Sequence, residues 1–344
     1  MGTHFEQFVR RTTRGAAVTI ASLALALAAS APAHAQDQKA TEPAIRQVEQ
    51  RARDLLRLDA AAAKAFDEEH PGVRPELQRH LPKATAKAFN WVDHNCVGQA
   101  HEQKAGDCWA NAVTEAVECS WLLRNGRRIY LSPQPLLDRT QNINEKGLSV
   151  GYPPERACDL LLKHGIAQAN LYPYTGKPDK YKSDVKMIFR IIAWSSVSPD
   201  GKPPSEAQLK EALLRHGPLA VTIYSTKSFH NFRGRGVFAE NLKLADNEAK
   251  GNHAVLLVGW DDRKGKHGAW RIRNSWRPSW GDDGYAWIEY GSDYVCFNAT
   301  WVKAQSIYYS LPAADFLKLV PEAEPLTRWR SPLDVAKDKE SLKK

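Results

Sequence analysis

The sequence predicts an α+β fold of two lobes, in which helices come first and strands follow. Between residues 108 and 165, apolar side chains recur at helical spacing, whereas from residue 219 onward they form short runs or alternate with polar residues. Between these regions, residues 195–204 are rich in Ser, Pro, Gly and Lys. Such a composition is typical of a connection, so we expect a crossover between a helical lobe and a strand-rich lobe there.

Two helices delimit the predicted helical lobe. The first begins at Cys108, where Asp107 stands in position to cap the N-terminus, and it ends before Gly126. The second runs from Pro154 through Leu162 and is closed by the His-Gly pair at 164–165. The start of the first helix places the Cys108 thiol among unpaired backbone N–H groups. These groups and the helix dipole favour a thiolate over a thiol.

The strand-rich lobe opens with a short helix. Ser205 and Gln208 are spaced as a capping box, and the helix that they start ends at Gly217. Four segments that follow are predicted as strands: 219–224, 253–260, 269–273 and 285–290. In the third of these, apolar residues alternate with Arg271 and Arg273, so we expect both arginines on the wet side of a half-buried strand.

The N-terminus has the pattern of a secretory signal peptide over residues 1–35. Three arginines precede an apolar run over residues 16–29, and Ala-His-Ala at 33–35 forms a cleavage site. The run is shorter than the roughly 20 residues of a membrane span, so we expect no stable membrane insertion. The protein should be exported, either periplasmic or secreted, with twin-arginine export and ordinary secretion both open.

The charge of the chain gives little support to nucleic-acid binding. Loss of residues 1–35 removes three Arg and one Glu, which lowers the formal net charge from +9 by two, to +7. The basic surplus is spread through all segments, and no basic-aromatic module is present. We therefore expect no nucleic-acid partner.

The cysteine count is odd, and an exported protein can form disulfides. The five are Cys96, Cys108, Cys119, Cys158 and Cys296. If Cys108 is a free reactive thiol, the remaining four allow three full pairings, which the sequence does not rank. The alternative is that several are small buried hydrophobic residues.

Three residues carry the strongest chemical signal. Cys108 is followed at a distance of 145 residues by His253 and at 166 residues by Asn274. A thiol attacks a carbonyl only as a thiolate, so it needs a proton acceptor and a group that orients that acceptor. Cysteine, histidine and asparagine can fill these roles of nucleophile, base and orienting amide, and the chemistry requires no cofactor or metal.

These residues and their surroundings resemble the papain family of cysteine peptidases over roughly residues 91–302. In that family the His and Asn lie about 130 to 150 residues after the Cys. The resemblance implies a helical left lobe and an antiparallel β-barrel-like right lobe with the active site in the cleft between them. The matching segments are 103–109, 131–137, 151–153, 171–174, 252–255, 274–276, 280–281 and 284–285.

The resemblance also implies further roles near the thiol. Gln103 would donate to the oxyanion, Trp109 would follow the nucleophile, and Trp276 would shield the hydrogen bond between His and Asn. The family places the Gln six residues before the Cys, where this chain has Glu102. We keep Gln103 and place a one-residue deletion after it.

Two departures from the family concern the substrate side of the cleft. A family disulfide would join positions that here hold Ala105 and about Leu148, so both partners are absent together. Val150-Gly151 replaces a Gly-Gly, and Gly151 should still offer its backbone to an extended substrate. By resemblance, the pocket for the residue two before the cut would draw on Tyr152, Pro153, Thr222 and Gly251 and prefer an apolar side chain.

The expected domain organisation has four parts. Residues 42–69 have helical spacing and are stopped by Pro and Gly at 71–72. This segment is either an inhibitory pro-segment over the active site or a plain N-terminal extension. The parts are the signal peptide 1–35, the segment 36–88, a peptidase-like domain 89–310 (lobes 89–198 and 199–310), and a Pro- and charge-rich C-terminal extension 311–344.

The functional expectation is an exported cysteine peptidase that acts on polypeptide substrates through an acyl-enzyme thioester. Two alternatives stay open. One is a catalytically silent protein of the same fold that serves as a binding or scaffold module. The other is an acyl transferase that uses the same three residues and passes the acyl group to an amine instead of water.

Overall fold

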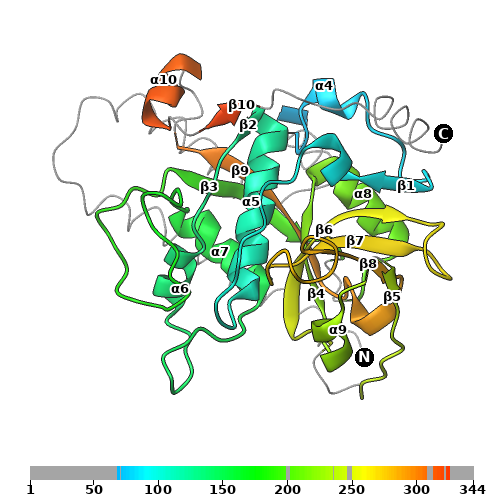
Figure 1. Ribbon diagram of the computed structural model, residues 1–344. Coiled ribbons are helices and arrows are strands. Elements are labelled where there is room, and N and C mark those ends of the chain that lie inside the picture. Colours follow the sequence, from blue (N-terminus) through cyan, green and yellow to red (C-terminus); the bar gives the residue numbers. More distant parts are fainter. Residues whose placement is uncertain are drawn as a thin grey trace, which may run out of the picture. The chain divides into compact units, whose positions relative to one another are not determined.

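The computed structural model describes residues 68–69, 71–198, 202–234, 236–245, 250–307, 313–320 and 323–325. The chain divides into two compact units, residues 1–70 and 71–344. In the first unit only Glu68 and Glu69 are described, and both are helical and exposed. The predicted signal peptide and nearly all of the predicted helix over 42–69 therefore lie outside the described residues. The helices and strands of the second unit are labelled in Figure 1.

The second unit combines helices with one large sheet and one small sheet. Its helices are α4 (Pro75–Gln78), η1 (Trp91–His94), α5 (Cys108–Asn125), α6 (Gln134–Thr140), α7 (Pro154–His164), α8 (Glu206–His216), α9 (Lys227–Asn231), η2 (Ser292–Tyr294) and α10 (Ala313–Leu319). Its strands are β1 (Ala88–Asn90), β2 (Arg127–Arg128), β3 (Phe189–Ser196), β4 (Leu219–Ile223), β5 (Val237–Phe238), β6 (His253–Asp261), β7 (Ala269–Arg273), β8 (Tyr285–Glu289), β9 (Ala299–Ser306) and β10 (Glu324–Pro325).

The large sheet is mostly antiparallel and open. Its strands follow the order β3-β9-β4-β6-β7-β8-β5, with β1 added to β6, and only β5 pairs in parallel, with β8. The predicted α+β fold is confirmed, but the prediction that the strands of the right lobe form a barrel-like sheet is wrong. The order ends at β3 and β5 without a pair between them among the described residues. Because β5 has only two residues and both pair with β8, it offers little edge for closing a ring.

Helix α5 is the central element of the unit. Figure 1 shows it with α6 and α7 on one side and strands β4, β6 and β7 on the other. Its residues 108–123 are all buried, and Gly126 ends it in the left-handed conformation with φ 71°. Asp107 occupies the predicted N-cap position, but its side chain makes no capping hydrogen bond. A helix buried on all sides can hold polar side chains only if they find partners.

Most of the other predicted elements are confirmed. Helix α7 covers the predicted second helix, and α8 begins with the capping box of Ser205 and Gln208. Strands β4, β6, β7 and β8 coincide with the four predicted strands to within one residue. The prediction that Arg273 faces water is wrong. Its side chain is 0% exposed and forms an ion pair with Glu115 of α5, which compensates the burial of its charge.

The segments on either side of the predicted peptidase-like domain pack against it where they are described. In the N-terminal segment, Val73 and Leu77 are buried, and the Arg74 N–H donates to the carbonyl of Leu123. In the C-terminal extension, Phe316 of α10 is buried and stacks on Trp121 with ring centroids 5.5 Å apart. Strand β10 pairs with β2. The predicted domain boundaries at 35, 88 and 310 stay predictions.

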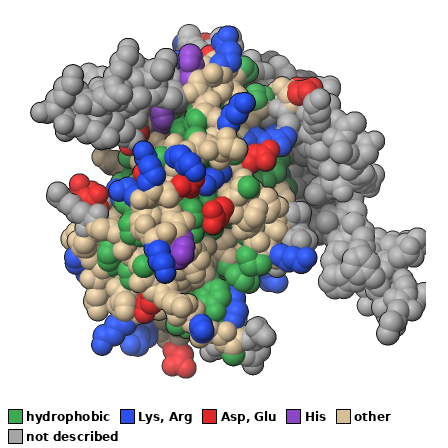
Figure 2. Space-filling model, turned by 90° about the vertical axis from the view of Figure 1, so that its right-hand side faces the viewer, with side chains coloured by type: hydrophobic (Ala, Val, Ile, Leu, Met, Phe, Trp, Pro, Cys, Tyr) green, Lys and Arg blue, Asp and Glu red, His purple; other side chains and the backbone are tan. Residues whose placement is uncertain are grey.

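Charged side chains are mixed on the strand-rich side of the unit. Figure 2 shows Lys and Arg side chains standing among acidic, apolar and polar ones across that face. Several of the basic residues are paired with acids, as Arg263 is with Asp261 at 2.9 Å and Arg271 with Asp282 at 3.2 Å. Such pairs reduce the positive potential that the net charge alone would suggest.

Candidate active site

Cys108 is the first residue of α5 and is 7% exposed. The backbone N–H groups of Ala254 and Trp109 hydrogen-bond its sulfur. Burial raises the pKa of the Cys108 thiol to about 11, against the opposing effect of these N–H groups. Since Ala254 directly follows His253, its contact places the thiol beside the start of β6. The thiol at the start of α5 therefore lies close to the backbone next to His253, and a direct contact between the two side chains stays a prediction.

His253 and Asn274 are joined by a hydrogen bond of 2.8 Å between Nε2 and Oδ1. His253 begins β6, whereas Asn274 directly follows β7 and is fully buried. The backbone N–H of Ser275 also donates to Asn274 Oδ1, at 2.9 Å. That atom is therefore an acceptor, and His253 Nε2 must be the donor. In the neutral ring this leaves Nδ1 without a proton, ready to accept one.

The histidine ring is held by aromatic neighbours. Trp276 stacks on His253 with ring centroids 4.4 Å apart, and His230 stacks on Trp276 at 4.2 Å. Burial lowers the pKa of His253 to about 4, although the hydrogen bond to Asn274 opposes this shift. Burial thus disfavours a lone imidazolium just as it disfavours a lone thiolate at Cys108. In a thiolate–imidazolium pair, each charge would compensate the other and offset this cost of burial.

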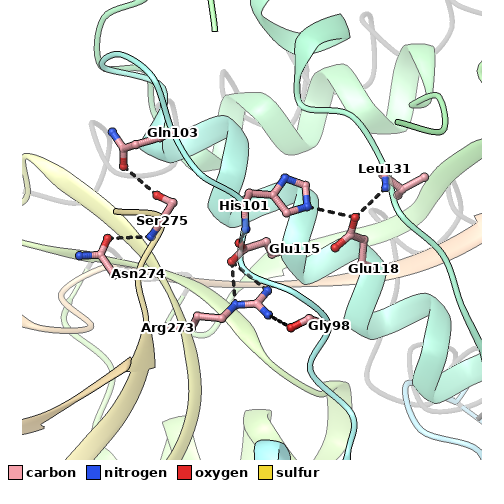
Figure 3. Close-up of polar contacts among 9 residues, drawn as sticks. All are labelled: Gly98, His101, Gln103, Glu115, Glu118, Leu131, Arg273, Asn274 and Ser275. Atoms are coloured by element: carbon pink, nitrogen blue, oxygen red, sulfur yellow. Dashed lines mark hydrogen bonds and ion pairs between the residues drawn. The ribbon is translucent and has the colours of Figure 1, made fainter. Parts of the chain in front are cut away.

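Gln103 lies against the segment that carries Asn274, and its neighbour Glu102 points elsewhere. The Gln103 Oε1 accepts from Ser275 Oγ at 2.7 Å (Figure 3). Its backbone N–H donates to the Ser275 carbonyl at 2.8 Å. Its Nε2 donates to the carbonyl of Ala105 at 2.7 Å, which engages one of two amide protons. Glu102 is exposed and pairs with Arg277 at 2.6 Å. This arrangement favours Gln103 over Glu102 as the oxyanion donor.

The loop between Gln103 and Cys108 is held by contacts that sequence reasoning missed. The Tyr174 hydroxyl donates to the buried carboxylate of Asp107 and accepts from the Lys104 N–H at 3.0 Å. The Gly106 N–H donates to the carbonyl of Ser149 at 3.0 Å. The Gly106 bond ties the loop to the residue next to Leu148, near one of the two positions that the expected family disulfide would join. The one sequence signal for these contacts was Asp107, an acidic residue directly before the predicted nucleophile, which needs hydrogen-bond donors if it is buried.

The residues predicted to bind substrate fall into two groups. In the helical lobe, Gly151 is exposed, and Tyr152 packs on Trp109 with ring centroids 5.0 Å apart. Pro153 is the N-cap of α7. In the strand-rich lobe, Thr222 of β4 is 8% exposed and closes tightly on Gly251, where an added Cβ would lie 2.8 Å from the Thr222 Cβ. That the two groups form one pocket stays a prediction.

The five cysteines are all free and buried. The sequence left open three disulfide pairings and the alternative that several cysteines are small buried residues. The structure agrees with the alternative. Within the described residues, no group of three or more His, Cys, Asp or Glu side chains is arranged to hold a metal ion. No described helix is both long and apolar enough to span a bilayer.

Comparison with protein families identifies the class. The family model described as papain family cysteine protease matches residues 85–307, so the chain belongs to that family. The cathepsin L-like proteinase of Phaedon cochleariae is 28% identical over 216 residues, 62% of this chain and 63% of that protein. Cathepsin K of Mus musculus is 33% identical over 200 residues, 57% of each chain. The chain spans about three fifths of the length of the curated relatives that it matches.

Solved structures give the same fold. The ragweed pollen allergen Amb a 11, a cysteine protease in its proform, superposes with a TM-score of 0.54 and 25% identity over 69% of this chain and 73% of that one. A cysteine protease of Carica candamarcensis in complex with E-64 gives a TM-score of 0.51 at 23% identity, covering 63% of this chain and 98% of the other.

Proposed function

We propose that the protein is an exported cysteine peptidase that hydrolyses peptide bonds through a Cys108 thioester. The observation that carries this proposal is the hydrogen bond from His253 Nε2 to Asn274 Oδ1 beside a thiol at the start of a buried helix. It leaves Nδ1 of the imidazole as the proton acceptor. Family membership supports the same chemistry.

In the proposed reaction the Cys108 proton passes to His253 Nδ1, and the thiolate attacks the carbonyl carbon of the scissile bond. The resulting oxyanion accepts from the Cys108 backbone N–H and from the second amide proton of Gln103, which the bond to Ala105 leaves available. Loss of one such donor typically costs roughly a hundredfold or more in rate. The imidazolium then protonates the leaving amine, and a thioester remains.

Hydrolysis of the thioester completes the cycle. His253 takes a proton from water, the hydroxide formed attacks the acyl carbon, and the sulfur leaves as thiolate and regains its proton from the imidazolium. Asn274 keeps the ring oriented in both halves of the reaction, and Trp276 covers the ring face. If an amine replaces water in this step, the same residues carry out acyl transfer.

We also propose that an extended peptide pairs with the backbone of Gly151. This residue is exposed, and an added Cβ there would meet nothing within 4 Å, so the backbone is accessible from that side. The adjoining pocket of Tyr152, Pro153, Thr222 and Gly251 would receive an apolar side chain two residues before the cut.

Export and a pro-segment complete the proposal. The pattern over residues 1–35 supports export to the periplasm or beyond. Residues 36–88 precede the proposed catalytic residues, and a similar solved structure is a proform. If this segment inhibits, trimming it from the purified full chain raises the activity, whereas unchanged activity after its removal would refute inhibition.

The proposed reaction is tested with fluorogenic dipeptidyl substrates. Cys108→Ala should abolish hydrolysis, whereas Cys158→Ala, which removes another buried thiol, should keep it. Equal rates in the wild type and in Cys108→Ala would end the claim. Product analysis with an added amine distinguishes hydrolysis from acyl transfer.

A further inference from the structure

A buried cluster of four charged or titratable side chains lies beside the proposed catalytic residues (Figure 3). It joins His101, from the segment that leads to α5, with Glu115 and Glu118 of α5 and with Arg273, the last residue of β7. The side chains are 13%, 2%, 6% and 0% exposed, in that order. Buried charges persist only when they are paired, so the contacts within this cluster decide its charge state.

The first half of the cluster links the two lobes. Arg273 directs both Nη2 and Nε at Glu115 Oε2, at 3.0 and 3.2 Å, and its Nη1 donates to the carbonyl of Gly98. The other oxygen of Glu115 accepts the backbone N–H of His101 at 2.7 Å. Residues 98–101 are therefore clamped between the helix that carries Cys108 and the strand that leads to Asn274.

The second half of the cluster depends on the histidine. His101 Nε2 lies 3.1 Å from Glu118 Oε1, and that oxygen also accepts the Leu131 N–H at 2.6 Å. Two carboxyl groups face a single arginine, so with both of them ionised the cluster is neutral when His101 carries a proton. Loss of that proton would leave one negative charge uncompensated in a buried site.

Within the part of the chain that the structure describes, two further titratable groups face the cluster, and a second arginine, Arg128, faces one of them. Besides Glu115, Glu118 and Arg273, the facing titratable groups are Cys119 of α5 and Tyr285 of β8. Burial raises the pKa of Cys119 to about 12 and also raises the pKa of Tyr285, so both are neutral near neutral pH. Arg128 of β2 is directed to the carbonyl of Asn95 at 2.9 Å.

We propose that protonated His101 is a positioning residue for the proposed reaction, which holds Gln103 in place relative to Cys108 and Asn274. The inference rests on the proposed function. Gln103 lies two residues after His101, and its backbone and side chain bind Ser275, which lies two residues after Arg273. His101 thus fixes the segment that carries Gln103, and Arg273 fixes the segment that carries its partner Ser275.

The direction of the pH dependence follows from the surroundings of His101. Burial by itself lowers the pKa of His101. The charge of Glu118 and its hydrogen bond to the ring act in the opposite direction, and the net effect is a raised pKa. A raised folded-state pKa contributes stability that is fully present below the unfolded value of about 6.5. That stability is lost as the pH rises through the folded-state pKa. Both folding and activity should therefore weaken on the alkaline side.

The test compares His101→Lys, which keeps a positive charge, with His101→Gln, which removes it. His267→Lys changes an exposed histidine and is the matched control. We expect His101→Gln to lower kcat by about tenfold with little change in KM, as expected for a displaced oxyanion donor. His101→Lys should keep kcat and lose the alkaline decline of both activity and unfolding midpoint. The control should keep the wild-type pH profiles.

The outcomes separate this inference from the proposed function. An alkaline decline in His101→Lys equal to that of the wild type, in both activity and unfolding midpoint, would overturn it. If His101→Gln does not fold, the comparison of His101→Lys with the wild type still decides. If the wild type has no peptidase activity but its unfolding midpoint has the alkaline decline that His101→Lys removes, the charge balance stands and the proposed function fails.

Discussion

The hydroxyl of Tyr174 donates a hydrogen bond to the carboxylate of Asp107, the residue directly before the Cys108 thiol. Asp107 is 0% exposed, and its other oxygen accepts the Ala105 N–H at 3.3 Å. A buried carboxylate without such donors would carry a large desolvation cost. Tyr174 therefore stabilises the loop that leads from Gln103 to the thiol.

Replacing Tyr174 by Phe tests this role. The variant leaves Asp107 without its hydroxyl donor and Lys104 without an acceptor for its N–H. We expect a loss of about 1–3 kcal/mol in the free energy of unfolding, measured with urea. Any hydrolytic activity should fall as well, because the loop carries Gln103. Tyr181→Phe is the control, and equal stability of the two variants would refute the role of Tyr174.

The charge of Asp107 should hinder formation of the thiolate. Burial is the main cause that raises the pKa of Cys108, and the adjacent carboxylate adds to it. Asp107→Asn removes the charge but keeps an oxygen that can accept from Tyr174. We measure the rate of Cys108 alkylation by iodoacetamide as a function of pH. The pH at which this rate reaches half of its maximum should be lower in the variant than in the wild type. An unchanged midpoint would show that the carboxylate has no effect on the thiol.

The ion pair of Arg273 and Glu115 should couple strongly in stability measurements. Removing one partner from a buried pair leaves an uncompensated charge and typically costs about 3–5 kcal/mol. We expect Arg273→Met to be destabilised by about this amount and Arg273→Met with Glu115→Leu to recover much of it. Urea unfolding of both single variants and the double variant measures the coupling. Additive losses in the double variant would contradict a direct interaction.

Local sequence patterns predicted the helices and strands whose positions depend on residues close together in the chain. The helix start at Cys108, the capping box at Ser205 and the four main strands follow from spacing over a few residues. The roles of Cys108, His253 and Asn274 were expected from residue type and chain order. The structure places Cys108 beside Ala254, the next residue after His253, and joins His253 to Asn274.

The failures share a physical cause in contacts between distant segments. Strand alternation placed Arg273 in water, but its partner Glu115 lies 158 residues earlier in the chain, and no local pattern reports such a pair. Asp107 had the right position to cap α5, yet its carboxylate is bound by Tyr174, 67 residues later. The closure of a barrel likewise depends on whether two edge strands meet, which strand patterns alone do not encode.

The most direct test is labelling of the purified protein with an epoxide inhibitor of thiol proteases, followed by peptide mapping. We predict one modified residue, Cys108, with labelling abolished in Cys108→Ala and kept in Cys158→Ala. Because all five cysteines are buried, selective reaction at Cys108 requires both an activated thiol and an open approach to it. Absence of labelling at Cys108, or equal labelling of another cysteine, would contradict the proposed peptidase and favour a catalytically silent protein of the same fold.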